Sequence, residues 1–207
     1  MSLNSTKLVL HVIDEILMPL MTSASSTNDL NNPDGFQFLT YSDSLDIGGH
    51  RIRSYRQRVI ANLKESVYQA SGGYTFFVPV EEGFKPHPRP ELIDKKVIDG
   101  HIIPNRVVFT SSAPIEQPFE TLAFEDNIKV TVTFFTQGEG KHLKTYVKSN
   151  TVVGDSKHST GVVLAEIVRA NIPVRNGVVH LIHRPLMVVD TTVKQFLEFA
   201  EKSMLIL

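Results

Sequence analysis

The segment from Asn176 to Met187 constrains the fold more than any other, because it combines a turn signal, a strand and a stop. Asn-Gly marks a tight turn, and the residues after it are rich in β-branched types, which favour strands. Pro185 has no backbone N–H to donate to a neighbouring strand, so the strand should end before it. The pattern predicts a buried strand from Val178 to Ile182, entered through a turn in which Gly177 has a positive φ angle.

A second copy of this pattern occurs near the start of the chain, from Leu8 to Met18. Aligning His11 with His180 gives an offset of 169 residues, which is about the length of one domain. A pattern that recurs once per domain predicts that the chain was cut from a tandem array of repeats. The predicted organisation is the C-terminal strand remnant of a preceding repeat (1–21), a polar linker (22–33), one domain (34–193) and the start of a following repeat or tail (194–207).

Three segments resemble the signatures of the fasciclin domain family, and they occur in the family's order. Gly73–Phe84 is similar to the first signature, Gly100–Pro104 to the central Tyr-His element with glycine for the tyrosine, and Asn176–Met187 to the second signature. The resemblance implies an α+β fold, in which a wedge of short β-strands packs with several helices. The signature residues expected to have structural roles are Thr75, Phe76, Pro79, Phe84, His101, Pro104, Asn176, Gly177, His180 and Leu186.

The same resemblance implies an extracellular, cell-surface adhesion module that acts by protein–protein contact, in a neural setting. The expected partner is the protein itself, the matrix or a cell-surface receptor, and the parent protein is expected to carry a lipid anchor outside this chain. Some family members are associated with integrin binding through an Asp-Ile pair. Here the pair is Asn171-Ile172, so the carboxylate is missing. Asn4 begins the one Asn-x-Ser/Thr sequence of the chain, which is a glycosylation acceptor in secreted proteins.

Composition excludes several classes of protein. The chain has no cysteine, so it forms neither disulfides nor thiolate metal sites. Its 21 Lys and Arg residues are scattered, which argues against nucleic-acid binding. No stretch approaches the roughly 20 uncharged apolar residues of a membrane helix. The apolar content of 42% is sufficient for the core of one domain.

No motif for catalysis or for a cofactor is recognisable. His180 and His183 are three residues apart on the predicted strand, so their side chains should point to opposite faces and cannot share a metal ion. We expect His180 to be a core histidine bonded to a neighbouring backbone group. The segment Gly154–His158 contains Asp, Ser and His, but adjacent residues do not form a triad, and a charged surface turn is favoured. We therefore expect no enzyme activity, no metal and no cofactor.

The densest basic cluster offers an alternative function. Arg51, Arg53, Arg56 and Arg58 lie within eight residues, in a segment with helical spacing. If their side chains share a face, that face could bind sulfated glycans such as glycosaminoglycans, or an acidic matrix partner. A solvated helix face is the simpler interpretation.

Hydrophobic spacing predicts the remaining elements. Apolar residues at helical spacing predict helices over 35–42, 51–70, 88–98 and 159–171. Alternating or β-branched runs predict strands over 74–80, 106–110, 129–134 and 143–148, the last two joined as a hairpin, with a loop over 111–118. Helices packed on short, mostly antiparallel strands again give an α+β fold.

Overall fold

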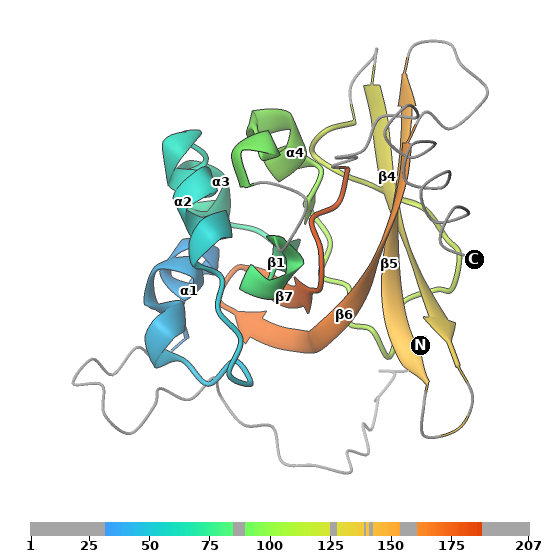
Figure 1. Ribbon diagram of the computed structural model, residues 1–207, viewed down its shortest axis with the longest axis horizontal. Helices are drawn as coiled ribbons and strands as arrows, with labels where there is room; N and C mark the ends of the chain where they lie inside the picture. Colours follow the sequence, from blue (N-terminus) through green and yellow to red (C-terminus); the bar gives the residue numbers. More distant parts are fainter. Residues whose placement is uncertain are drawn as a thin grey trace, which may run out of the picture.

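The computed structural model describes residues 32–84, 90–124, 128–138, 140, 143–153 and 161–187. Within these residues a seven-stranded sheet runs in the order β2-β1-β7-β6-β5-β4-β3, with the helices gathered beside its β1 end (Figure 1). The α+β prediction is therefore confirmed. The strands are β1 (Tyr74–Pro79), β2 (Ile102–Ile103), β3 (Phe119–Glu120), β4 (Ile128–Gln137), β5 (Lys144–Val153), β6 (Gly161–Val174) and β7 (Gly177–Ile182), and the α-helices are α1 (Gly35–Tyr41), α2 (Arg53–Ala61), α3 (Glu65–Gln69) and α4 (Lys95–Asp99).

Strand β6 joins two halves of the sheet. It pairs with β5 along its first part and with β7 along its second part, and Figure 1 shows it sweeping from beside β5 toward the side where the helices lie. Its register with β7 shifts between Ile167 and Arg169, and again between Arg169 and Ile172. Such bulges bend a strand, which is how one strand can serve both halves.

Strand β1 separates the core into two parts, because adjacent residues of a strand point to opposite faces. Phe76 faces the helices, where its ring stacks on that of Tyr68 at 4.9 Å, and the hydroxyl groups of Tyr68 and Tyr55 bond to each other at 2.8 Å. Phe77 faces the other way, with its ring 5.6 Å from that of Phe134 in β4. All five side chains are buried, so the sheet is packed on both faces at this point.

The helix predicted over 35–42 is confirmed as α1. The carboxylate of Asp34 accepts the N–H of Gln37 at 2.8 Å, and the side chain of Gln37 accepts the N–H of Asp34 at 3.0 Å. This reciprocal capping satisfies two N–H groups that a helix start otherwise leaves unpaired.

Two predicted helices differ from the structure. The segment 51–70 forms α2 and α3 rather than one helix, because Leu63 has a φ angle of 56°, which ends the first helix. In place of the helix over 88–98, the described part contains a short 3-10 turn and α4, which begins after Asp94. The carboxylate of Asp94 accepts the N–H of Val97 at 2.8 Å and caps α4.

The helix predicted over 159–171 is wrong, because the described part of that segment lies in strand β6. Val163 and Ala165 are buried whereas Val162 and Leu164 are exposed, which is the alternation of a strand. The bulges farther along shift the apolar positions, so that the sequence acquires helix-like spacings.

The strands predicted over 74–80, 129–134 and 143–148 are confirmed, as is the strand that follows the Asn176-Gly177 turn. Gly177 has a φ angle of 151°. The strand predicted over 106–110 is wrong, because these residues form a loop that pairs with no strand.

Several predictions fall outside the described residues. They are the strand remnant over 1–21, most of the linker over 22–33, the glycosylation acceptor Asn4, the turn over 154–158 and the segment over 194–207. The boundaries of the domain remain predictions.

Candidate functional site

Residues 106–118 form an irregular segment between β2 and β3, which we call the contact loop. It exposes three large apolar side chains, with exposed fractions of 40% for Val107, 41% for Phe109 and 67% for Ile115. Val108, between the first two, is buried. The sequence predicted a strand over 106–110, but the N–H groups of Val108 and Thr110 bond to side chains of the core instead of to a neighbouring strand.

Thr75 of β1 holds the beginning of the contact loop. Its side chain is fully buried, and its hydroxyl group donates to the carbonyl oxygen of Arg106 at 2.8 Å. The hydroxyl oxygen of Thr75 also accepts the N–H of Val108 at 2.9 Å. One hydroxyl group therefore pairs with one backbone acceptor and one backbone donor of the loop. Buried backbone groups that do not pair with a strand need such partners.

His180 of β7 holds the same point from the other side. Its Nε2 lies 2.9 Å from the carbonyl oxygen of Val108, and its Nδ1 lies 3.1 Å from the backbone nitrogen of Asn171. Because the N–H of Asn171 can only donate, the imidazole is neutral, with its proton on Nε2. Burial lowers the pKa of His180 from 6.5 to about 4, which favours the same neutral form.

Asn171 of β6 completes this arrangement. Its side-chain oxygen accepts the N–H of Thr110 at 2.9 Å, and its amide nitrogen donates to the hydroxyl group of Thr110 at 2.9 Å. Asn171 has a φ angle of 60° and lies next to the bulge in β6, a conformation that asparagine tolerates better than most residues. We call Thr75, Asn171 and His180 the brace, because together they fix residues 106–110.

His101, from the central signature, stabilises a different junction. Its Nδ1 lies 2.6 Å from the carbonyl oxygen of Val97 in α4, and its Nε2 accepts the N–H of Leu186 at 2.9 Å. Burial lowers its pKa from 6.5 to about 4. Pro104 follows β2 in a turn. Gly100, where the family pattern has tyrosine, lies against the side chain of Met187, which fills the space near its Cα.

The turn residues of the second signature are also tied into the core. The side-chain oxygen of Asn176 accepts the N–H of Gly35 at 2.9 Å, and its amide nitrogen donates to the carbonyl oxygens of Tyr68 and Ala70, both at 2.9 Å. A Cβ atom on Gly177 would lie 1.9 Å from the carbonyl oxygen of Tyr74. The remaining signature residues, which are all buried, are Phe76, Pro79, Phe84 and Leu186.

The structure does not gather the basic cluster into one free cationic face. The guanidinium group of Arg56 donates to the carbonyl oxygen of Thr40 at 2.9 Å, and that of Arg58 donates to the carbonyl oxygen of Ile93 at 3.0 Å. Arg51 and Arg53 are exposed. Of the pair suggested by the family's integrin contact, Asn171 belongs to the brace. Its neighbour Ile172 is buried, with 3% of its surface exposed.

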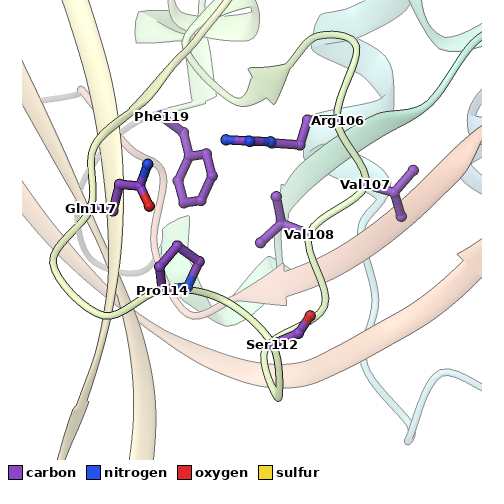
Figure 2. Close-up of a pocket in the computed structure, with 7 residues that line it drawn as sticks. All are labelled: Arg106, Val107, Val108, Ser112, Pro114, Gln117 and Phe119. Atoms are coloured by element: carbon purple, nitrogen blue, oxygen red, sulfur yellow. The ribbon is translucent and has the colours of Figure 1, made fainter. Parts of the chain in front are cut away.

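A small cavity opens beside the contact loop (Figure 2). Its volume is about 180 Å³, and the guanidinium carbon of Arg106 lies 5.3 Å from the centre of the Phe119 ring. The lining residues are Arg106, Val107, Val108, Ser112, Pro114, Gln117 and Phe119. No motif in the sequence indicated this cavity, whose lining residues come from the contact loop and from the first residue of β3.

The described residues contain no group of three or more His, Cys, Asp or Glu side chains that could hold a metal ion. His180 is buried and His183 is exposed, so they do not share a site. None of the described helices has the length and apolar character needed to span a membrane. The contact loop offers apolar contact area and one guanidinium group, which suits recognition of another molecule.

Comparisons with known proteins agree with the three signatures. The fasciclin domain model matches residues 52–188. Fasciclin-1 of Schistocerca americana is 61% identical over 95% of this chain, and fasciclin-1 of Drosophila melanogaster is 56% identical over 92% of it. The chain spans 29% of the length of each of these relatives.

A solved structure, a FAS1 domain pair from the insect cell adhesion molecule fasciclin I, aligns with 70% of this chain and 48% of its own. Its sequence identity is 21% and its TM-score is 0.47. The family model covers more than half of this chain, and both relatives are more than half identical over nearly all of it. The chain belongs to the fasciclin domain family.

Proposed function

We propose that this chain is a cell-adhesion module that acts at the outside of the cell through protein–protein contact and catalyses nothing. Its relatives are fasciclin-1 proteins, and fasciclin I is described as an insect cell adhesion molecule. The partner is a second copy, a matrix protein or a cell-surface receptor. The parent protein is held at the cell surface by a lipid anchor.

The observation that carries this proposal is the contact loop. Val107, Phe109 and Ile115 are exposed on one loop, while the brace fixes the backbone of its first part. Loops held by a rigid scaffold are common binding elements, and exposed apolar side chains gathered together favour protein contact. A loop already held in one conformation loses less conformational entropy on binding.

The buried titratable groups support a non-catalytic role. His101 and His180 are each bonded on both ring nitrogens to backbone groups of the core. Burial raises the pKa of Tyr55 well above its usual value, and its hydroxyl group bonds to Tyr68 inside the helix-side core. A general acid or base must reach its substrate, and these groups are enclosed.

Multivalent display provides the test. Single contacts between adhesion modules can be weak, because many copies on one surface raise the effective concentration. The soluble chain should therefore be a monomer at micromolar concentration by sedimentation, whereas beads that carry many copies should cluster. Clustering that excess soluble chain competes away supports self-contact. If the beads do not cluster with each other, and do not bind cells or matrix proteins, the proposal is wrong.

Sulfated-glycan binding through the basic cluster remains the alternative. Arg51 and Arg53 are its exposed members, whereas Arg56 and Arg58 already bond to backbone carbonyl groups. A glycan contact led by charge should weaken steeply as salt is added. Suppose that the beads do not cluster but bind soluble heparin, and that the double variant Arg51→Gln/Arg53→Gln loses this binding. The glycan proposal would then replace the first one.

A further inference from the structure

The cavity beside the contact loop has the size of one side chain. A cavity of about 150 Å³ holds a benzene-sized group, whereas pockets for cofactors or drug-sized ligands begin at about 300 Å³. The volume here is about 180 Å³. Figure 2 shows the side chains of Arg106 and Gln117 on either side of the Phe119 ring, with Val108 and Pro114 facing them. The cavity therefore combines an apolar wall with polar groups.

Arg106 is the charged group of this cavity. Among the described residues no carboxylate lies within ion-pair distance of its guanidinium group. The guanidinium group lies over the face of the Phe119 ring. The carbonyl oxygen of Arg106 is held by the hydroxyl group of Thr75, so the start of its side chain is fixed. A guanidinium group over the face of an aromatic ring makes no ion pair there and keeps N–H donors available, which match the two oxygens of a carboxylate.

The surroundings favour one carboxylate over a polyanion. The acidic residues within or next to the segment that lines the cavity, Glu116 and Glu120, are exposed, and Asp99 is paired with Lys64 at 2.7 Å. Glu120 is adjacent to Phe119 in β3 and therefore points to the opposite face of that strand. A sulfated glycan would need several cations in a row, whereas here one cation meets an apolar wall. The exposed Ile115 follows Pro114 at the rim, so apolar contact is available beside the charge.

From these observations we infer that the Arg106–Phe119 cavity is a specificity pocket, which receives an acidic side chain flanked by apolar residues on a partner protein. This inference rests on the proposed adhesion function and gives it a chemical preference. The carboxylate of the partner's acidic side chain bonds to the N–H groups of the Arg106 guanidinium, and the methylene groups of the same side chain pack on Val108 and Pro114. The apolar neighbours of the acidic residue lie on the exposed part of the contact loop.

The test compares two peptides that differ in one group, acetyl-Leu-Glu-Leu-amide and acetyl-Leu-Gln-Leu-amide. Each is titrated into the chain while NMR follows the side-chain Nε–H of Arg106 and the backbone amide of Phe119. The glutamate peptide should shift both signals and bind about tenfold more tightly, because a charge-assisted pair is stronger than a neutral hydrogen bond. Added salt should reduce this difference. Equal binding of the two peptides, or shifts elsewhere on the surface, would overturn the inference.

Two variants separate this inference from the adhesion proposal. Arg106→Gln should remove the preference for the glutamate peptide, whereas Arg53→Gln changes another exposed arginine and should leave it intact. If the parent chain shows no preference for the glutamate peptide, and beads of Arg106→Gln cluster as the parent beads do, adhesion stands and the carboxylate pocket is wrong. If the parent beads neither cluster nor bind cells, but the peptide preference follows Arg106, the pocket stands and the adhesion proposal is wrong.

Discussion

The brace and the exposed part of the contact loop are neighbours in space but lie in opposite environments. Thr75 and His180 are fully buried, and their polar atoms bond to the loop backbone. Phe109 and Ile115 project into solvent from the same loop. A buried donor or acceptor that loses its partner lowers stability, whereas an exposed side chain away from such features changes stability little. Stability and recognition should therefore depend on separate residues of one small region.

Gly177→Ala, a change at the Asn176-Gly177 turn, should cause the largest loss of stability. The new Cβ would lie 1.9 Å from the carbonyl oxygen of Tyr74, and the φ angle of 151° is unfavourable for alanine. We expect the free energy of unfolding to fall by more than about 3 kcal/mol, as measured by urea denaturation. Gly161→Ala is the matched control, since the nearest atom to its Cβ would be 3.9 Å away. Equal stability of the two variants would contradict the assigned turn.

The second largest loss of stability should come from acid, which protonates the two buried histidines. The folded-state pKa values of His101 and His180 are lowered from 6.5 to about 4, so the unfolded state binds more protons between these values. Stability is therefore complete above the unfolded pKa and decreases as the pH falls toward the folded pKa. At about pH 5 each histidine should remove on the order of 2 kcal/mol. Urea denaturation from about pH 7.5 to about pH 5 measures this loss, and a constant free energy of unfolding over that range would disprove it.

Thr75→Val tests the brace itself. The valine has a similar shape but leaves the N–H of Val108 and the carbonyl oxygen of Arg106 without their partner, which should cost about 1–3 kcal/mol. Thr133→Val is a matched control, because the buried hydroxyl group of Thr133 has no hydrogen-bond partner within the described residues. The control should be neutral or slightly stabilising. Similar losses of stability in both variants would show that the hydroxyl group of Thr75 does not stabilise the contact loop.

Ile115→Ser and Phe109→Ser should have the smallest effect on stability and a clear effect on contact. Ile115 is 67% exposed, so its replacement should change the free energy of unfolding by no more than about 0.5 kcal/mol, whereas that of Phe109, which is 41% exposed, should cost about 1 kcal/mol. Bead clustering or cell binding should nevertheless be reduced severalfold. Ile60→Ser removes an exposed side chain of α2 as a control. If all three variants cluster like the parent, the contact loop is not the binding surface.

Local signals explain what the sequence predicted correctly. The Asn176-Gly177 turn, the capped helix after Asp34 and the alternating strand β4 each depend on residues close together in the chain. The spacing of the signature residues could not reveal that Thr75 and His180 meet at Val108.

Long-range bonds explain what the sequence could not predict. The partners of Val108 lie 33 and 72 residues away along the chain, and the partner of Thr110 lies 61 residues away. Local sequence does not reveal such partners, and residues 106–110 were therefore predicted to be a strand although no strand pairs with them. The same limit applies to β6, whose register shifts occur in its pairing with β7.

Amide hydrogen exchange in the contact loop tests the central claim, that the brace holds this loop as rigidly as a strand. The N–H groups of Val108 and Thr110 bond to Thr75 and Asn171, whereas no acceptor for those of Val107 and Phe109 is found within the described residues. The account predicts alternating protection: Val108 and Thr110 exchange slowly, like amides of β1 and β7, while Val107 and Phe109 exchange fast. Rapid exchange at all four amides would contradict it, because the loop would then be open and not held for contact.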